Sequence, residues 1–139
     1  MITAQQLHEL GIAPVWVDPL NETFQRWKID TLEEQACFIG QFSYESNHFK
    51  DLEENLNYRP ETLMKLWPKR FPTMDEAMKY AHQPQKIANH IYSNRMGNRD
   101  EASGDGWLYR GSAICQLTGH DNFWHAGQAL GVDLVRNPD

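Results

Sequence analysis

Apolar positions recur along most of the chain at the three- and four-residue spacing of amphipathic helices. The clearest helix start lies at residues 31–34, where Thr31 and Glu34 form the pattern of a capping box. The positions that follow divide between two adjoining helix faces. One face holds Leu32, Ala36, Ile39 and Ser43, and the neighbouring face holds Phe38, Phe42 and Glu45. The pattern predicts a helix that ends near Asn47.

Cap, proline and glycine signals predict the other helices and the loops between them. Further helices are expected from Thr3 to Gly11 and over residues 22–28, 60–66, 73–82, 84–92 and 121–130, with Tyr92 in the buried stripe of the fifth and Gly131 ending the last. Loops are expected over residues 14–19 and 95–106, and a short extended piece within residues 107–117. No repeat or linker divides the chain, so the pattern predicts one mainly α domain over residues 1–139 with little β structure.

Composition narrows the function classes. Nineteen acidic and thirteen basic side chains give a net charge of −6, which argues against a nucleic-acid partner. No apolar run is long enough for a membrane span, and the start lacks the basic-then-apolar pattern of a signal peptide. We therefore expect cytoplasmic synthesis and no membrane partner, with a holin-type or other export route if the substrate lies outside.

Cysteine and histidine patterns give no sign of a bound metal or cofactor. Two cysteines, Cys37 and Cys115, are too few for a disulfide framework, and Cys37 is expected to be a buried free thiol in an apolar helix. The six histidines form no ligand spacing typical of zinc, and no glycine-rich phosphate loop is present. We expect neither a metal nor a cofactor.

Two carboxyl groups in contrasting surroundings suggest acid–base chemistry. Glu45 ends the apolar helix beside Phe42 and Phe38, where partial desolvation would raise the pKa of its carboxyl, as a general acid requires. Glu54 lies in a polar, asparagine-rich segment, where a carboxylate is expected to stay ionised. Such a pair is the arrangement of glycoside hydrolysis. On composition alone, a solvated glutamate at a helix end is the more common explanation of Glu45.

Three longer motifs carry a family resemblance. They are ESNHFKDLEENLNY from Glu45, IANHIYSNRMGN over residues 87–98 and GDGWLYRGSAICQLTGHDNF over residues 104–123. In this order they resemble glycoside hydrolase family 19 of the lysozyme-like superfamily, which holds class I-type chitinases and related phage endolysins. The resemblance spans about residue 32 to the C-terminus, and the nine-residue spacing of the two glutamates is most similar to the endolysin branch. It implies a lysozyme-like helical fold.

The resemblance also implies roles for the two glutamates. Glu45 would be the general acid that protonates the leaving oxygen, and Glu54 would be the base that activates water. The family inverts the anomeric centre, so the two carboxyls are expected roughly 6.5–9.5 Å apart, with room for that water.

Further residues match the family's substrate-binding positions. Gln116, Thr118 and Asn122 would hydrogen-bond the sugar or the water. Tyr58, Trp107 and Tyr109 would form an apolar floor for the sugar rings, although aromatic residues at such positions are more often core residues. Arg95 and Arg110 are expected to hold the loops by pairing with backbone or carboxylate groups.

The chain departs from the family pattern at two places. Gly111-Ser112-Ala113 stands where the family usually has Gly-Arg-Gly. The missing arginine and glycine lie at the floor of the family's groove, so weaker substrate binding is expected. Family members also continue past the motif that ends at Asp139, so the C-terminal helices are expected to be lacking. Self-association, or completion by another chain, would then cover the exposed apolar surface.

The resulting prediction is an inverting, endolysin-like glycosidase that cleaves β-1,4 bonds of N-acetylated glycans. Peptidoglycan is the favoured polysaccharide, as in a bacteriolytic cell-wall enzyme. Two alternatives stay open: a chitinase acting on chitin oligomers, and a catalytically silent sugar-binding or partner-dependent form.

Overall fold

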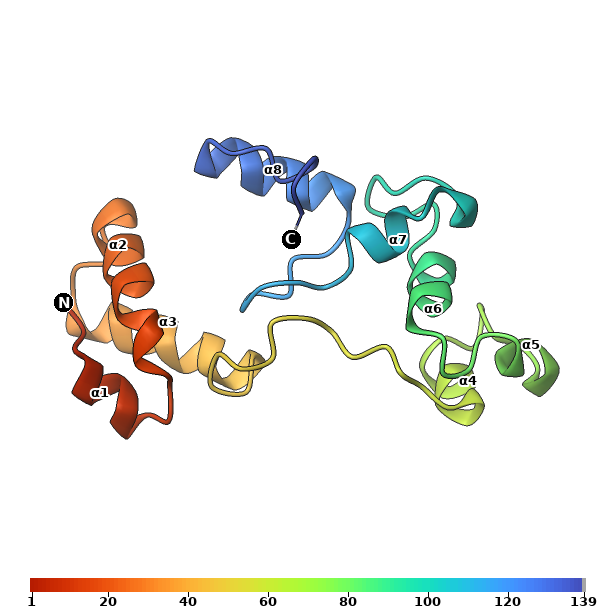
Figure 1. Ribbon diagram of the computed structural model, residues 1–139, viewed down its shortest axis with the longest axis horizontal. Coiled ribbons are helices and arrows are strands. Elements are labelled where there is room, and N and C mark those ends of the chain that lie inside the picture. Colours follow the sequence, from red (N-terminus) through yellow and green to blue (C-terminus); the bar gives the residue numbers. More distant parts are fainter. Residues whose placement is uncertain (139) are drawn as a thin grey trace. The chain divides into compact units, whose positions relative to one another are not determined.

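Helices dominate the fold (Figure 1). The computed structural model describes residues 1–138. The α-helices are α1 (Ala4–Glu9), α2 (Val17–Trp27), α3 (Leu32–Glu45), α4 (Pro60–Leu66), α5 (Met74–Met78), α6 (Pro84–Ile91), α7 (Asp105–Leu108) and α8 (His120–Leu130), and two short 3-10 helices are η1 (Pro14–Trp16) and η2 (Glu101–Ser103). Over the described residues, the only β pairing consists of isolated bridges at Ser112. The prediction of a mainly α, lysozyme-like chain is confirmed.

The described residues form two compact units. The first contains Met1–Leu52 and Ala113–Cys115, and the second contains Glu53–Ser112 and residues 116–138. The chain thus returns to the first unit for three residues before it continues in the second. A single catalytic domain over residues 1–139 stays a prediction.

The first unit is built around a cluster of apolar side chains from its helices and loops. Buried members of this cluster are Leu7, Ile12, Leu20, Phe24, Ile39 and Phe49. Phe38, Phe42 and Ile114 pack against them. α3 begins as predicted, since the Thr31 side chain accepts the Glu34 N–H and the Glu34 carboxylate accepts the Thr31 N–H.

The second unit has its own apolar cluster. Its buried members are Leu56, Leu63, Phe71, Ala77, Ile87, Ala88 and Ile91. Pro60 and Pro84 begin α4 and α6, as predicted, because proline at the first helical position gives up no needed N–H. Gly131 ends α8 in the left-handed conformation, also as predicted.

Several sequence expectations about the elements were wrong. Residues 14–19 are helical, with η1 running into α2, because Pro19 lies in the first turn of α2, where no backbone N–H has a helical partner. α5 ends at Met78, four residues earlier than expected. α7 occupies the start of the segment expected to be extended.

Cys37 also differs from its prediction. It is exposed, as is Cys115. The apolar core cluster meets α3 on the face that carries Phe38, Ile39 and Phe42, and Cys37 lies off that face. In the described part of the chain, no helix has the length and apolar character needed to cross a membrane.

Candidate active site

Glu54 lies in the irregular segment between Leu52 and α4, next to the loop that follows α7. An antiparallel bridge joins Glu53 to Ser112. Beside it, the Glu54 N–H donates to the Gly111 carbonyl at 2.9 Å, and the Gly111 N–H donates to Glu54 Oε1 at 2.7 Å. Because backbone and side chain of Glu54 are both held by one residue, the carboxylate has a fixed position in the second unit.

The second oxygen of the Glu54 carboxylate is held by Tyr92. The Tyr92 hydroxyl, at the C-terminal end of α6, donates to Glu54 Oε2 at 2.8 Å. Burial, and secondly the negative charge of Glu54, raise the pKa of Tyr92 well above its ordinary value. The phenol therefore stays protonated near neutral pH and remains a hydrogen-bond donor.

Gly111 is the point where other side chains meet Glu54. A Cβ atom at Gly111 would lie 2.7 Å from Gln116 Oε1, 3.3 Å from Glu54 Cδ and 3.3 Å from Thr118 Oγ1. Gly111 is buried, so only the absence of a side chain lets these three groups approach one another. The geometry thus brings Gln116 and Thr118 beside Glu54.

Hydrogen bonds between residues close in sequence order the segment that carries Gln116 and Thr118. Thr118 Oγ1 donates to the Gln116 carbonyl at 3.0 Å. Asn122, in the first turn of α8, donates from Nδ2 to the Thr118 carbonyl at 2.7 Å. Glu54, Gln116, Thr118 and Asn122 are therefore linked within the second unit, and their oxygen and amide groups can exchange hydrogen bonds with hydroxyls and N-acetyl groups.

The three aromatic candidates differ in their placement. Tyr58 and Trp107 are half-buried and pack against the apolar cluster of the second unit. The rings of Tyr58 and Trp67 meet in a T-shaped contact, with centroids 5.6 Å apart. The Arg110 guanidinium lies 4.2 Å from the centroid of the Trp107 ring and covers one of its faces.

Tyr109 is a core residue, contrary to its expected place on a sugar-binding floor. It is 5% exposed, its ring packs on Phe123 and His120, and its hydroxyl donates to the Val135 carbonyl at 3.1 Å. Both the ring and the polar end therefore have partners inside the protein, which is what a buried tyrosine requires.

The two arginines hold loops, as expected. Arg110 donates to the Trp107 carbonyl at 3.1 Å and to Glu53 Oε2 at 2.8 Å. Arg95 donates to the Ile91 carbonyl at 3.4 Å. The Arg110–Glu53 pair lies next to Glu54 and Gly111 in sequence, so it fixes the same two segments that position Glu54.

Glu45 is the last residue of α3 in the first unit, and its side chain is exposed. Its Oε1 accepts a hydrogen bond from Gln41 Nε2 at 3.0 Å. The expected shielding by Phe38 and Phe42 is absent, because their rings pack on each other and Phe38 packs on Phe24, toward the core.

An unusual turn follows Glu45. Asn47, His48 and Phe49 all have positive φ, between 49° and 62°, a conformation that costs a residue with a side chain about 1–2 kcal/mol. Ser46, which is fully buried, holds this turn, because its Oγ donates to the Phe42 carbonyl at 2.5 Å and accepts the Phe49 N–H at 3.0 Å. Backbone strain of this kind is found preferentially at functional sites.

The sequence proposed Glu54, Gln116, Thr118 and Asn122, which the structure brings together, but it assigned no role at the site to Tyr92 or to the backbone of Gly111. Tyr92 was interpreted as part of a buried stripe. The signal for its role was present, since a buried phenol needs a hydrogen-bond partner. The separation of the Glu45 and Glu54 carboxyls stays a prediction. Among the described residues, no group of three or more His, Cys, Asp or Glu side chains could hold a metal ion.

A known protein of similar sequence gives independent information. No family model matches the chain. A curated protein of Haemophilus influenzae, described as a glycosyl hydrolase family 19 domain-containing protein, is 46% identical to it over 101 residues. The match covers 73% of this chain and 50% of the relative, so the chain spans about half the length of that protein.

Proposed function

Because the chain belongs to glycoside hydrolase family 19, we propose that it is a glycosidase that cleaves β-1,4 bonds of N-acetylated glycans, with peptidoglycan as the favoured polymer. The proposal includes an endolysin-like, bacteriolytic role at the cell wall, reached by holin-type or other export. The observation that carries it is the Glu54 carboxylate, held by Gly111 and Tyr92 beside Gln116 and Thr118.

In the proposed mechanism, Glu54 is the general base. Each of its oxygens accepts one hydrogen bond from a fixed donor, and each keeps a lone pair for a water molecule. The carboxylate removes a proton from that water while the water oxygen attacks the anomeric carbon. Attack from the face opposite the leaving group inverts the anomeric centre.

Glu45 is the proposed general acid. Its carboxylic acid gives its proton to the glycosidic oxygen as the bond to the anomeric carbon breaks, so one proton is removed and one is supplied in each turnover. Gln116, Thr118 and Asn122 are proposed to orient the water or the N-acetyl sugar, and Tyr58 and Trp107 to pack against sugar rings. Tyr92 is proposed as a positioning residue that acts through Glu54.

The test uses the purified chain with bacterial peptidoglycan and, separately, with chitin oligomers, and products are identified by mass spectrometry. Glu45→Gln and Glu54→Gln are expected to abolish release of disaccharide muropeptides. Glu61→Gln serves as the control, since Glu61 is an exposed carboxyl on α4. Cleavage of chitin oligomers alone would transfer the proposal to a chitinase.

Absence of cleavage from both polymers would contradict the proposed activity of this chain. The remaining alternatives would then be a catalytically silent sugar-binding form and a partner-dependent form. Titration with the same oligomers, followed by tryptophan fluorescence, separates the two: saturable binding without turnover indicates the sugar-binding form.

A further inference from the structure

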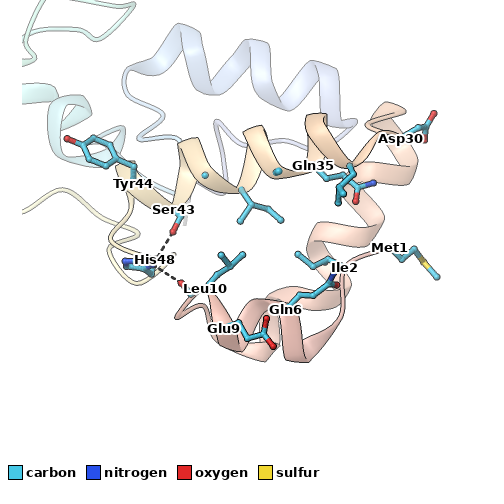
Figure 2. A pocket seen from close by; sticks show the side chains of 14 residues that line it. Met1, Ile2, Gln6, Glu9, Leu10, Asp30, Gln35, Ser43, Tyr44 and His48 are labelled. Atoms are coloured by element: carbon cyan, nitrogen blue, oxygen red, sulfur yellow. Dashed lines mark hydrogen bonds between the residues drawn. The ribbon is translucent and has the colours of Figure 1, made fainter.

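A groove runs along the first unit between α1 and α3 (Figure 2). It has a volume of about 720 Å³, and most of its exposed lining is apolar. Ile39 forms part of its lining and belongs to the buried core, whereas Leu10 on one side and Leu32 on the other are 48% and 73% exposed. The apolar lining therefore extends from the buried core to the surface. Within the first unit, no segment covers the exposed part of this lining.

The α3 side of the groove is a continuous helical stripe. The lining positions on it are Leu32, Gln35, Ala36, Ile39, Gly40 and Ser43, at intervals of three and four residues. The stripe spans three turns, or about 17 Å at 1.5 Å per residue. At one end, His48 Nδ1 lies 3.1 Å from Ser43 Oγ and 3.0 Å from the Leu10 carbonyl and so joins α3 to the segment after α1 (Figure 2).

Gly40 marks the open part of this stripe. It lies within α3, where glycine costs about 0.5–1 kcal/mol relative to alanine. A Cβ atom built at Gly40 meets no heavy atom within 4 Å, so no contact of the described residues requires glycine there. Together with Ala36 one turn earlier, Gly40 leaves space for the backbone of another helix to approach α3 closely.

The charge of the first unit is strongly negative. This unit contains eight acidic and three basic side chains, so it carries five of the six net negative charges of the whole chain. The acidic side chains in the groove lining are Glu9 on α1 and Asp30 before α3, and no lysine or arginine lines the groove. Glu33 is exposed on α3 beside this stripe.

We propose that the groove binds an amphipathic helix of another polypeptide, with an apolar stripe of three to four turns and lysine or arginine on its flanks. The apolar stripe would cover Ile39, Leu10 and Leu32, and the basic flanks would face Glu9, Asp30 and Glu33. Helix-in-groove recognition fits the walls, which are helices with no free strand edge for an added strand among the described residues. This proposal does not depend on the proposed glycosidase activity.

The test uses a fluorescein-labelled synthetic 16-residue peptide with leucine at helical positions a, d and e and lysine at the flanking positions. One control peptide carries glutamate in place of lysine. The second control peptide has the composition of the lysine peptide, but its order is scrambled so that the leucines form no stripe on a helix. Fluorescence anisotropy on the whole chain is expected to show saturable binding of the lysine peptide, at least tenfold tighter than either control peptide. Equal binding of all three peptides would overturn the proposal.

Two variants locate the binding. Gly40→Leu fills the groove at a position with free space and is expected to weaken binding of the lysine peptide at least tenfold. Cys37→Leu places the same leucine side chain at an exposed position of α3 outside the groove and is expected to leave binding unchanged. Circular dichroism melts confirm that both variants fold. Binding that survives in Gly40→Leu would place the peptide elsewhere and overturn the proposal.

Other occupants give different results with the same samples. A second copy of the chain would appear in sedimentation as a dimer that Gly40→Leu disrupts, without selective peptide binding. A lipid surface would appear as co-sedimentation with phosphatidylcholine or phosphatidylglycerol vesicles that Gly40→Leu abolishes. Either result overturns the proposed basic helix as the occupant.

Discussion

A single glycine organises the surroundings of Glu54. The Gly111 N–H binds one carboxylate oxygen, the Gly111 carbonyl accepts the Glu54 N–H, and the missing side chain leaves room for Gln116 and Thr118. Gly111 positions the Glu54 carboxylate through its backbone groups. Substitution of Gly111 is therefore expected to affect activity more than stability.

Gly111→Ala is expected to lower the cleavage rate about tenfold or more, because the new Cβ displaces the Gln116 amide and loosens the carboxylate contact. Since the closest atom is the end of a flexible side chain, the free energy of unfolding should fall by less than about 1 kcal/mol. Cleavage rates on the polymer that the wild-type chain is found to cut, and urea unfolding, check the two effects.

Gly104→Ala is the control for Gly111→Ala. Gly104 has a φ of +80° with open space around it, so alanine there should cost about 1 kcal/mol of stability and leave the rate unchanged. Full activity in Gly111→Ala would remove Gln116 from the proposed machinery.

Ala113 is a second position where the backbone decides the outcome. Its φ is +61°, and it is exposed. The left-handed conformation costs alanine about 1–2 kcal/mol, and glycine returns part of this through its freedom in the unfolded chain. Ala113→Gly is therefore expected to raise the free energy of unfolding by about 0.5–1 kcal/mol in urea titrations.

Ala102→Gly provides the comparison for Ala113→Gly. Ala102 is an exposed residue within η2, so glycine there should lower stability by about 0.5–1 kcal/mol. Destabilisation by both substitutions would show that Ala113 carries no backbone strain.

The capping box at Thr31 predicted its contacts correctly, and the family pattern named Glu54, Gln116 and Thr118, which the structure brings together around Gly111. Contacts between distant segments were harder to predict. Tyr92 contacts a residue 38 positions away, and Tyr109 has a carbonyl partner 26 positions away, so helical spacing alone could not assign their roles.

Among the elements, the turn after α3 has the least expected conformation. Asparagine and histidine are enriched at positive φ among residues with side chains, but phenylalanine adopts it rarely. Three contacts hold the turn. The buried ring of Phe49 packs on Trp16, and His48 Nδ1 is hydrogen-bonded to the Leu10 carbonyl. The Ser46 hydroxyl donates to the carbonyl of Phe42 and accepts the N–H of Phe49. Local propensity predicted the end of α3 within two residues, but not this turn, because its stability comes from tertiary contacts.

Ser46→Ala is expected to lower the free energy of unfolding by about 1–3 kcal/mol, because the Phe49 N–H, with its residue buried, loses its acceptor. Chemical denaturation followed by circular dichroism measures the loss. Thr23→Ala, which removes a hydroxyl that only donates to the Pro19 carbonyl on α2, should change stability by no more than about 0.5 kcal/mol. Equal effects from the two substitutions would contradict a special role of Ser46.

At the scale of the whole molecule, tyrosines predict a loss of stability in alkaline solution. Burial is the largest cause that raises the pKa of Tyr80, Tyr92 and Tyr109, and nearby carboxylates add to it. A group whose pKa is higher in the folded than in the unfolded state stabilises the fold fully below the unfolded pKa, near 10. This stabilisation is lost as the pH rises from there through the folded pKa.

Urea unfolding between pH 8 and pH 11 is therefore expected to show a constant free energy of unfolding at first and a decline above about pH 10. Tyr92→Phe should make the decline less steep, since Tyr92 has the most strongly raised pKa of the three. An identical decline in the variant would show that Tyr92 ionises as an ordinary tyrosine.

The connectivity of the two units has a consequence for attempts to divide the protein. The chain enters the first unit a second time at Ala113–Cys115, where Ile114 packs against the core cluster. A gene fragment that stops after Leu52 would therefore express an N-terminal piece without one of its own core side chains, and a fragment that starts at Glu53 would carry that side chain away. No single cut in the chain separates these two units. Neither unit can therefore be transferred to another protein as one continuous gene segment, either in evolution or by engineering.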